Sequence, residues 1–447
     1  MRCEAGHPVS VDLSLERVQL VKSRLGLAFR APVITVGGTN GKGSVCAMLE
    51  SIATHSGWRV GCYSKPHLIS FEERCRINGV PTTADQLIPH FAAVEKARGE
   101  TTLTYFEHTT LAILRFLSTI DLDLVVLEVG LGGRRDAVNV VDADCSVITT
   151  VDIDHTEYLG PTREVIGLEK AGIMRPNRPV VVGDTNPPES LCQYADLTRA
   201  RLLLAGRDFH HRPKGSGNWM WSFGEVQLDD LPNPALVGDH QGCNAAVALT
   251  ALASLSQLPE LSRRAVASGL SETRLRGRFQ ILRGAPAVIL DVAHNRQAAC
   301  ALSANLSKMR PKGRVLAVFG CMRDKDVNAL IESILVWANE WFLTDLPVKR
   351  AATAHELSEV LRSQLRRDST SISCWARPMH AFDAALTSAR PDDLVLVFGS
   401  FYTVGEVLAH VDKRIRHGRD FSVCSEVEAL KSVLTLDRCE SDNLPKA

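Results

Sequence analysis

The stretch that decides the fold reads 35-TVGGTNGKGSVCAML-49. It follows the apolar run 31-APVITVG-37 and leads into the helix-like segment 44-SVCAMLESIATHSG-57, so the order is strand, glycine-rich loop, helix. Backbone amides of such a loop, with the N-terminus of the helix, form a cradle for an anion. We therefore predict a phosphate-binding loop, in which the Gly, Thr and Asn amides surround the anion and Lys42 supplies a point charge.

One position of this loop departs from the usual pattern. The pattern G-x-x-x-x-G-K-[ST] places a hydroxyl directly after the lysine, where it binds Mg²⁺. Here Gly43 follows Lys42, and the hydroxyl of Ser44 comes one residue later. Some metal ligands are therefore expected from elsewhere. A carboxylate at the C-terminal edge of a neighbouring strand is the natural source, because ligands of parallel sheets bind at that edge.

Two side chains are candidates for this metal site. Glu128 ends the run 122-LDLVVLEVG-130, and a buried glutamate is rare without a partner. His155 closes the segment that starts with 145-CSVITTVDI-153. A single histidine at a strand end is more often structural, but beside the strand of Glu128 and a nucleotide loop we favour metal ligation.

Apolar runs alternate with helical patterns through most of the chain. The runs are continuous, as expected for strands covered on both faces, so we predict an α/β fold with a parallel sheet. Residues 200–235 interrupt this pattern with short strands and turns, and the alternation restarts after 274-RLRGRFQILRGAP-286. We predict two domains and a loosely ordered tail with a short helix at 427–436; the bounds are 1–275, 276–417 and 418–447.

The composition limits which classes of partner and which cellular compartment are expected. The chain has 447 residues, with 51 Lys plus Arg and 51 Asp plus Glu, so charge gives no case for nucleic acid or an anionic membrane. The N-terminus lacks the apolar core of a signal peptide, and no apolar run is long enough to span a bilayer. The twelve cysteines contain no C-x-x-C pair, which favours reduced thiols in a cytoplasmic protein. A monomer is expected.

Several long motifs, in one order from about Val11 to Tyr402, resemble the folylpolyglutamate synthase/dihydrofolate synthase family of the Mur ligase superfamily. The presence of LTYFE and RRDA is similar to the bifunctional bacterial form. The matching stretches are ITVGGTNGKGS, YSKPHLISFEERCRING, LTYFEHTTLA, EVGLGGRRDAVNVVDAD, DHTEYLGPTREVIGLEKAGI, NAAVAL, GRFQ, DVAHN, DKD and FGSFYTV.

The resemblance implies a fold and a set of site residues. It implies an N-terminal P-loop domain of the Mur ligase type with a parallel sheet, and a smaller Rossmann-like C-terminal α/β domain. The implied ATP-binding residues are Thr39, Asn40, Gly41, Lys42, Gly43, Ser44, Asn244, Arg278 and Asp291, the last two across the domain cleft. The implied magnesium ligands are Glu128, His155, Lys170 as a carbamate, and either Ser44 or Ser64. The implied catalytic residues are Lys42, Glu128, His155 and Lys170.

The implied pterin site includes Phe106, whose ring is a reasonable stacking face for a flat heterocycle. A core aromatic is nearly as good an interpretation of Phe106 from the sequence alone. The full set of implied pterin residues is Asp12, Leu13, Ser14, Thr104, Tyr105, Phe106, Glu107, Arg135, Asp136 and Ala137.

Three departures from the family pattern stand out. The loop after the second strand usually reads S-S-P or T-S-P, and its second hydroxyl helps to hold Mg²⁺; here Lys65 occupies that position. A charged lysine has no lone pair to offer a metal. We expect its side chain to carry the charge to solvent, with Ser64, Ser44 or water completing the metal shell. The family's N-terminal helix is nearly absent, which leaves open an incomplete pterin site or a longer true start. HNR replaces the usual HNP at 294–296.

The implied activity is ATP-dependent ligation of L-glutamate to dihydropteroate and to folate glutamate tails, through an acyl phosphate. Three alternatives stay open: a folylpolyglutamate synthase without the first activity, a nucleotide-binding protein that has lost catalysis, and a P-loop NTPase that couples hydrolysis to motion. The GKG spacing and the absence of a sensor pattern disfavour the NTPase.

Overall fold

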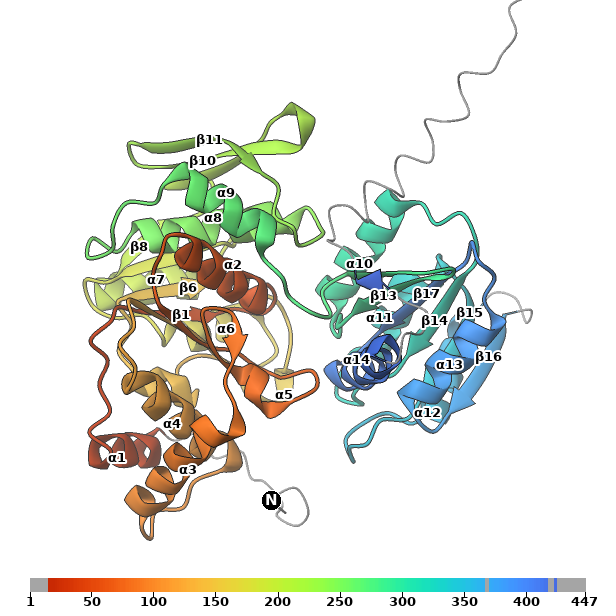
Figure 1. The fold of residues 1–447 in the computed structure, drawn as a ribbon, viewed down its shortest axis with the longest axis horizontal. Coiled ribbons are helices and arrows are strands. Elements are labelled where there is room, and N and C mark those ends of the chain that lie inside the picture. Colours follow the sequence, from red (N-terminus) through yellow and green to blue (C-terminus); the bar gives the residue numbers. More distant parts are fainter. Residues whose placement is uncertain (1–14, 366–369, 417–421, 424–447) are drawn as a thin grey trace, which may run out of the picture. The chain divides into compact units, whose positions relative to one another are not determined.

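The computed structural model describes residues 15–365, 370–416 and 422–423. The chain divides into two compact units, of which the first comprises Met1–Pro234 and Asp239–Thr273, and the second Ala235–Gly238 and Arg274–Ala447. The helix expected at 427–436 lies outside the described residues, as do Asp12, Leu13 and Ser14 of the expected pterin site. The predicted two-domain α/β architecture is confirmed in its class, with a parallel sheet in each unit (Figure 1).

The first unit is built on a mixed sheet that is parallel in its centre. Strands β2, β5, β1, β6, β7 and β8 run parallel, and β3 and β4 add an antiparallel edge. In sheet order the strands are β4 (Val80–Pro81), β3 (Cys75–Ile77), β2 (Val60–Tyr63), β5 (Leu124–Glu128), β1 (Val33–Gly37), β6 (Cys145–Ile148), β7 (Pro179–Val182) and β8 (Arg201–Leu204). The central strands are buried throughout, which explains why they read as continuous apolar runs.

Helices cover both faces of this sheet (Figure 1). The apolar core around Val125 and Leu127 of β5 takes in side chains of three helices, α1 (Glu16–Arg24), α3 (Ala84–Arg98) and α4 (Tyr105–Ser118), and of the 3-10 turn η2 (Ala137–Val140). The core around β6 and β7 is formed with α6 (Arg163–Ala171) and α7 (Glu189–Thr198). The remaining long helices are α2 (Lys42–His55), α8 (His240–Ala253) and α9 (Arg263–Glu272).

The expected β excursion at 200–235 is in part a separate sheet. Strand β8 joins the edge of the main sheet, whereas β9 (Phe209–Pro213), β10 (Asn218–Phe223) and β11 (Val226–Pro232) form an antiparallel sheet of their own. Trp221 anchors this sheet on α8, since its indole Nε1 donates to Thr250 Oγ1 at 3.0 Å. Three short elements complete the unit: η1 (Phe71–Arg74), α5 (Thr156–Leu159) and η3 (Gly215–Gly217).

The second unit repeats the layered design. Its sheet order is β16 (Ser371–Trp375), β15 (Ala338–Thr344), β14 (Val315–Phe319), β17 (Leu394–Phe398), β13 (Ala287–Asp291), β12 (Gln280–Arg283) and β18 (Ser422–Val423), and only β12 and β18 are antiparallel to their neighbours. Its helices are α10 (Arg296–Met309), α11 (Val327–Leu335), α12 (Ala354–Gln364), α13 (Pro378–Ser388) and α14 (Phe401–Arg416).

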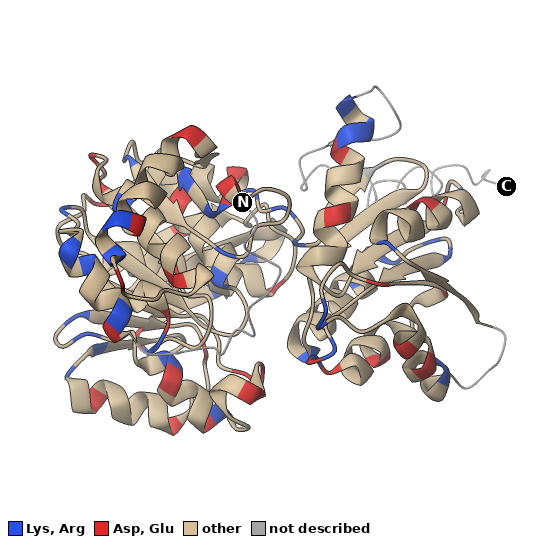
Figure 2. Ribbon diagram, turned by 90° about the horizontal axis from the view of Figure 1, so that it is seen from below, with Lys and Arg blue, Asp and Glu red and all other residues tan. Residues whose placement is uncertain are grey.

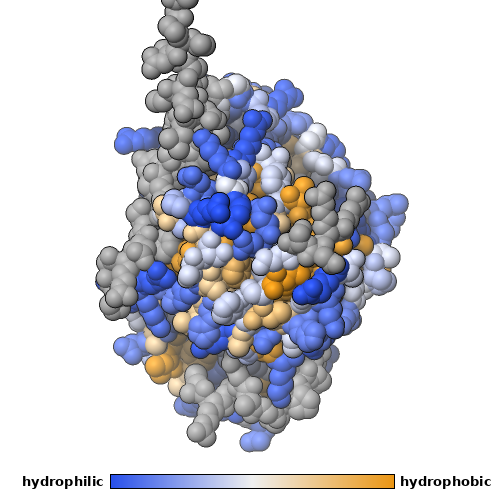
Figure 3. Space-filling view, turned by 90° about the vertical axis from the view of Figure 1, so that its right-hand side faces the viewer, coloured by the Kyte–Doolittle hydropathy of each residue, from blue (hydrophilic) through white to orange (hydrophobic). Residues whose placement is uncertain are grey.

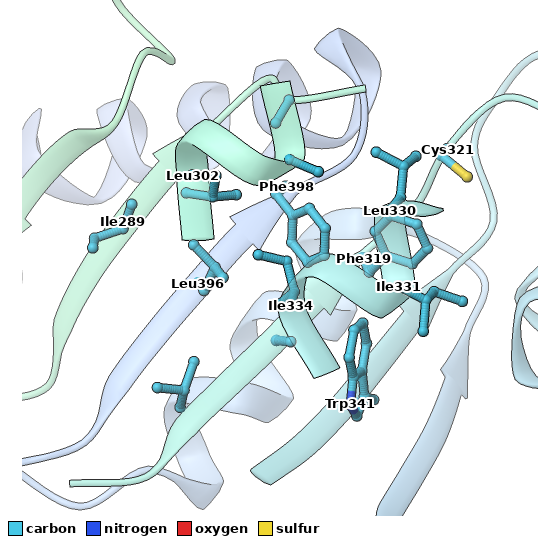
Figure 4. Packing of buried hydrophobic residues seen from close by; sticks show 14 of the residues in the cluster. Ile289, Leu302, Phe319, Cys321, Leu330, Ile331, Ile334, Trp341, Leu396 and Phe398 are labelled. Atoms are coloured by element: carbon cyan, nitrogen blue, oxygen red, sulfur yellow. The ribbon is translucent and has the colours of Figure 1, made fainter. Parts of the chain in front are cut away.

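The core of the second unit is aromatic at its centre (Figure 4). Phe319 of β14 and Phe398 of β17 stack with their ring centroids 4.7 Å apart, and Trp341 of β15 meets Phe319 edge-on. The face of this unit seen in Figure 3 is largely hydrophilic with scattered apolar side chains. Basic and acidic residues are interspersed on both units (Figure 2), and among the described residues no helix has the length and apolarity needed to cross a bilayer.

Candidate active site

The glycine-rich loop joins β1 to α2, as predicted, and Gly41 is the residue on which it turns. Gly41 adopts φ 87°, a left-handed conformation that L side chains rarely tolerate. A Cβ at this position would also lie 2.8 Å from Asn244 Oδ1, on α8. The loop therefore needs glycine here for two independent reasons, and Asn244 lies against the loop.

The anion cradle differs in one respect from the prediction. The amide of Thr39 donates to Thr150 O at 2.8 Å, and the amide of Asn40 donates to Thr150 Oγ1 at 3.2 Å, so both amides tie the loop to the end of β6. The amide of Val45 is the first with a helical partner, Gly41 O. The amides at the start of α2 precede this bond and point out of the helix N-terminus, where an anion would meet them.

Lys42 spans the same loop. Its ammonium donates to the carbonyl oxygens of Gly38 and Thr39, both at 2.9 Å. These bonds keep the charge over the loop, next to the first amides of α2. A phosphate at the helix N-terminus would meet both the amides and this ammonium.

Glu128 lies beside the loop, at the C-terminal end of β5. The ladder between β1 and β5 sets it opposite Val36, and only 3% of the residue is exposed. Its charge reaches α2, since the pKa of the Cys46 thiol is raised well above its ordinary value by burial and next by Glu128. A buried carboxylate therefore lies close to Cys46 of the phosphate-binding helix.

The two candidate serines are not equivalent. The hydroxyl of Ser64 accepts a hydrogen bond from Arg76 Nη1 at 2.7 Å, so a positive charge already lies against this oxygen. The hydroxyl of Ser44, in the first turn of α2, makes no hydrogen bond within the described residues. A hydroxyl without a cationic donor suits a metal better, so Ser44 rather than Ser64 stays the predicted serine ligand for Mg²⁺.

His155 and Lys170 both lie in the segment after β6, and Lys170 is close enough to Lys42 of the loop for the two charges to interact. His155 adopts φ 52° at the start of α5, and its Nε2 lies 3.9 Å from Asp154 Oδ2. Lys170 lies in the last turn of α6 and is 3% exposed; burial, and next the charge of Lys42, lower its pKa to about 7. The carboxylates of Asp154 and Glu169 oppose this shift. Lys170 is therefore a buried amine near Lys42.

Glycines after β5 bring α6 close to this strand. A Cβ on Gly133 would lie 2.9 Å from the Cα of Lys170 and 2.8 Å from its carbonyl oxygen. The loop 130–134 thus packs directly on the C-terminal turn of α6, which fixes Lys170 at the edge of the sheet where Glu128 ends.

A magnesium ion fits this donor set in part. Glu128 and the Ser44 hydroxyl supply the hard oxygen ligands that Mg²⁺ prefers, and a carbamate on Lys170 would add another. No group of three or more His, Cys, Asp or Glu side chains that could hold a metal occurs in the described part of the chain.

The prediction that Lys65 carries its charge to solvent is wrong. Its side chain is 5% exposed, and Nζ lies 3.2 Å from Asp136 Oδ1, whose side chain is 1% exposed. The ammonium also sits 4.2 Å from the ring centroid of Phe106 and 4.8 Å from that of Tyr63. Burial lowers the pKa of Lys65 from its ordinary value, while Asp136 opposes the shift. A nearby buried counter-charge and two aromatic faces outweigh the solvation that a flexible lysine usually seeks.

Two other residues of the expected pterin site, Thr104 and Glu107, have structural roles. Thr104 caps α4, since its hydroxyl accepts the Glu107 amide, and the Glu107 carboxylate accepts the Thr104 amide in return. Glu107 also accepts from Arg17 Nη2 at 2.7 Å. Ala137 is buried in the core, whereas Tyr105 and Arg135 are exposed. Phe106 shows both an aromatic face and a charged neighbour, the Lys65 ammonium.

Arg278 and Asp291 belong to the second unit. Asp291 accepts the amides of Phe279 at 2.8 Å and Ala293 at 2.7 Å, and burial raises its pKa while Arg278 lowers it. The Arg278 guanidinium lies 5.3 Å from the ring centroid of Phe401. Their action on a nucleotide held by the first unit stays a prediction.

Sequence reasoning missed two contributors to the site. Thr150 holds the loop from the segment after β6, and Tyr63 forms one face of the Lys65 site. Tyr63 had a usable signal, because it ends the strand that precedes Lys65. Thr150 had none, since its role comes only from the pairing of β1 with β6.

Comparison with known proteins places these features in a family. The family model described as Mur ligase middle domain matches residues 36–252, and that described as Mur ligase, glutamate ligase domain matches residues 277–401. The dihydrofolate synthase/folylpolyglutamate synthase of Escherichia coli K12 is 41% identical over 414 residues, which cover 92% of this chain and 94% of that protein.

Solved structures give the same result. The E. coli FolC structure in complex with DHPP and ADP has a TM-score of 0.85 and 41% identity, covering 92% of this chain and 95% of the other. A bifunctional folylpolyglutamate synthase/dihydrofolate synthase with Mn, AMPPNP and L-glutamate bound has a TM-score of 0.82 and 39% identity, covering 90% and 95%. The chain belongs to the dihydrofolate synthase/folylpolyglutamate synthase family of Mur ligases.

Proposed function

We propose that the protein ligates L-glutamate to dihydropteroate, giving dihydrofolate, and then extends the glutamate tails of folates, at the expense of ATP, in folate biosynthesis. The observation that carries the proposal is the convergence, at one sheet edge, of the α2 amides, Lys42, the buried carboxylate of Glu128 and the buried amine of Lys170. Such a site serves phosphoryl transfer to an oxygen nucleophile.

The proposed reaction has two steps. A carboxylate oxygen of the acceptor attacks the γ-phosphorus of ATP; a P–O bond to the carboxylate forms, and the bond to the β,γ-bridging oxygen breaks, releasing ADP. The amine of L-glutamate then attacks the acyl carbon of the acyl phosphate. The C–N bond forms, the C–O bond to phosphate breaks, and a proton leaves the nitrogen.

The chain's own residues position the charge of this reaction. The amides at the start of α2 and the Lys42 ammonium bind phosphate oxygens and stabilise the charge on the transferring group. Glu128, Ser44 and a carbamylated Lys170 would hold Mg²⁺, which supplies Lewis-acid neutralisation of the phosphates when bound. Lys170 suits carbamylation, because its pKa of about 7 leaves much of the amine neutral near neutral pH.

The test is release of ADP by the purified protein with four mixtures: ATP alone, ATP with glutamate, and ATP with glutamate plus either dihydropteroate or tetrahydrofolate. The proposal predicts strong stimulation in both complete mixtures. Stimulation by tetrahydrofolate alone would support the narrower folylpolyglutamate synthase. ADP release that no folate acceptor alters would refute the ligase and support an NTPase.

A cytosolic location is part of the proposal. It is supported by the cysteines of the described residues, nine of which are free thiols. The monomeric state stays a prediction.

A further inference from the structure

The buried cation at Lys65 has no role in the chemistry above. The backbone of Lys65 is held beside the proposed metal ligand, because the Lys65 amide donates to Glu128 Oε2 at 3.1 Å. Its ammonium lies at the pterin side, against Asp136 and Phe106. One residue thus links the carboxylate proposed to hold Mg²⁺ with the ring proposed to face the pterin.

Asp136 does not depend on this lysine for its hydrogen bonds. Its Oδ2 accepts the amides of Gly130 at 2.8 Å and Leu131 at 3.0 Å, and its Oδ1 accepts the amide of Val138 at 3.0 Å. A carboxylate has about four acceptor positions, and three are filled by backbone. The fourth holds the ammonium. Asp136 is therefore a fixed anchor that orients Lys65.

Lys65, in contrast, retains donors. An ammonium has three N–H groups, and only the one to Asp136 has an oxygen acceptor among the described residues. The remaining groups face the rings of Phe106 and Tyr63, which attract a cation but accept weakly. A buried ammonium in this state gains from any ligand that brings an acceptor atom.

The backbone leaves space for this arrangement. A Cβ on Gly130 would lie 3.2 Å from both Cδ and Nζ of Lys65, and 3.1 Å from Asp136 Oδ2. The end of the lysine side chain therefore occupies a defined position against the loop after β5, which a methyl group on Gly130 would disturb.

We propose that Lys65 is a specificity-determining residue of the pterin site, which donates a hydrogen bond from its Asp136-oriented ammonium to an acceptor on the edge of the heterocycle, a ring carbonyl oxygen or an unprotonated ring nitrogen. The inference rests on the proposed function, because it takes Phe106 and Asp136 as residues of the pteroate site. It gives this chain a cationic donor where the family pattern has a serine.

The test compares Lys65→Met with wild type and with Lys96→Met, a matched change of an exposed lysine on α3. The measurements are the Kd for dihydropteroate, the inhibition constant of the free pterin heterocycle, and the KM values for ATP and glutamate. Loss of one charge-assisted hydrogen bond should weaken dihydropteroate and the free pterin by about 10- to 150-fold. The KM values for ATP and glutamate should change by less than about threefold, and Lys96→Met should change nothing.

Unchanged or tighter binding of dihydropteroate by Lys65→Met would overturn the inference and indicate that the lysine merely fills the site. Should Lys65→Met not fold, Gly130→Ala tests the same point with the charge retained. It should weaken dihydropteroate while a non-hydrolysable ATP analogue binds as in wild type, and unweakened dihydropteroate binding would again overturn the inference. Wild-type protein that binds no dihydropteroate would refute the proposed function as well, which separates the two failures.

Discussion

The Nζ of Lys65 lies 3.2 Å from Oδ1 of Asp136, in a pair whose side chains are almost fully buried. The two partners depend on the pair unequally. Asp136 has three backbone amides besides the lysine, whereas Lys65 has one carboxylate and two aromatic faces. This inequality makes the consequences of the two single substitutions different.

Asp136→Asn should destabilise the protein by about 3–5 kcal/mol, because it leaves a buried ammonium without its counter-charge and turns an amide NH₂ toward backbone donors. Lys65→Met should cost less, since backbone amides still compensate the remaining carboxylate. Urea unfolding of the full chain measures both. Equal destabilisation by the two changes would contradict the inequality.

Gly41→Ala should weaken binding of a non-hydrolysable ATP analogue by at least tenfold. The new Cβ would combine a φ of 87° with a 2.8 Å approach to Asn244 Oδ1, and so displace the turn that starts α2. Gly57→Ala is the matched control, because Gly57 has φ 84° but nothing within 4 Å of its added Cβ. Calorimetric titration should show weaker binding of the ATP analogue only for Gly41→Ala. Similar affinities of the two variants would contradict the claim that nucleotide binding needs the turn at Gly41.

Glu128→Gln keeps the shape of the side chain and its ability to accept from the Lys65 amide, but removes the charge. We expect the rate of ligation to fall at least a hundredfold, with the thermal midpoint within a few degrees of wild type. ADP release at varied Mg²⁺ is the measurement. Near wild-type turnover at ordinary Mg²⁺ would rule out Glu128 as a metal ligand.

Lys170 should carry a carbamate when bicarbonate is present. Protein incubated with ¹³C-bicarbonate is expected to give a carbamate carbon signal by NMR, which Lys170→Ala loses, along with nearly all activity. Acetate should restore part of that activity. A carbamate signal that persists in Lys170→Ala would assign the modification to another amine.

The sequence predicts the frame of this molecule well, because its signals are local. The strand–loop–helix around Lys42 and the buried strand that ends at Glu128 both follow from continuous apolar runs and glycine punctuation. The start of α2 at Lys42, two residues before the predicted segment, reflects the turn at Gly41, which periodicity does not register.

The site is harder to predict from the sequence, because its geometry comes from contacts between segments that are distant along the chain. The direction of Lys65 is set by Asp136, 71 residues away, and the burial of Lys170 by a glycine loop that packs on α6. The choice of Ser44 over Ser64 likewise depends on Arg76, which reaches back across the β2–β3 pair. None of these contacts has a sequence spacing that would predict it.

The central claim is that ATP activates the acceptor carboxylate as an acyl phosphate. The most direct test uses dihydropteroate labelled with ¹⁸O in both carboxylate oxygens, with ATP and L-glutamate, and mass analysis of the phosphate released. Transfer of the γ-phosphoryl group to the carboxylate predicts one ¹⁸O atom in each phosphate and one retained in the new amide. Phosphate without ¹⁸O from the acceptor, released at the same rate, would contradict the account, because water would then be the nucleophile.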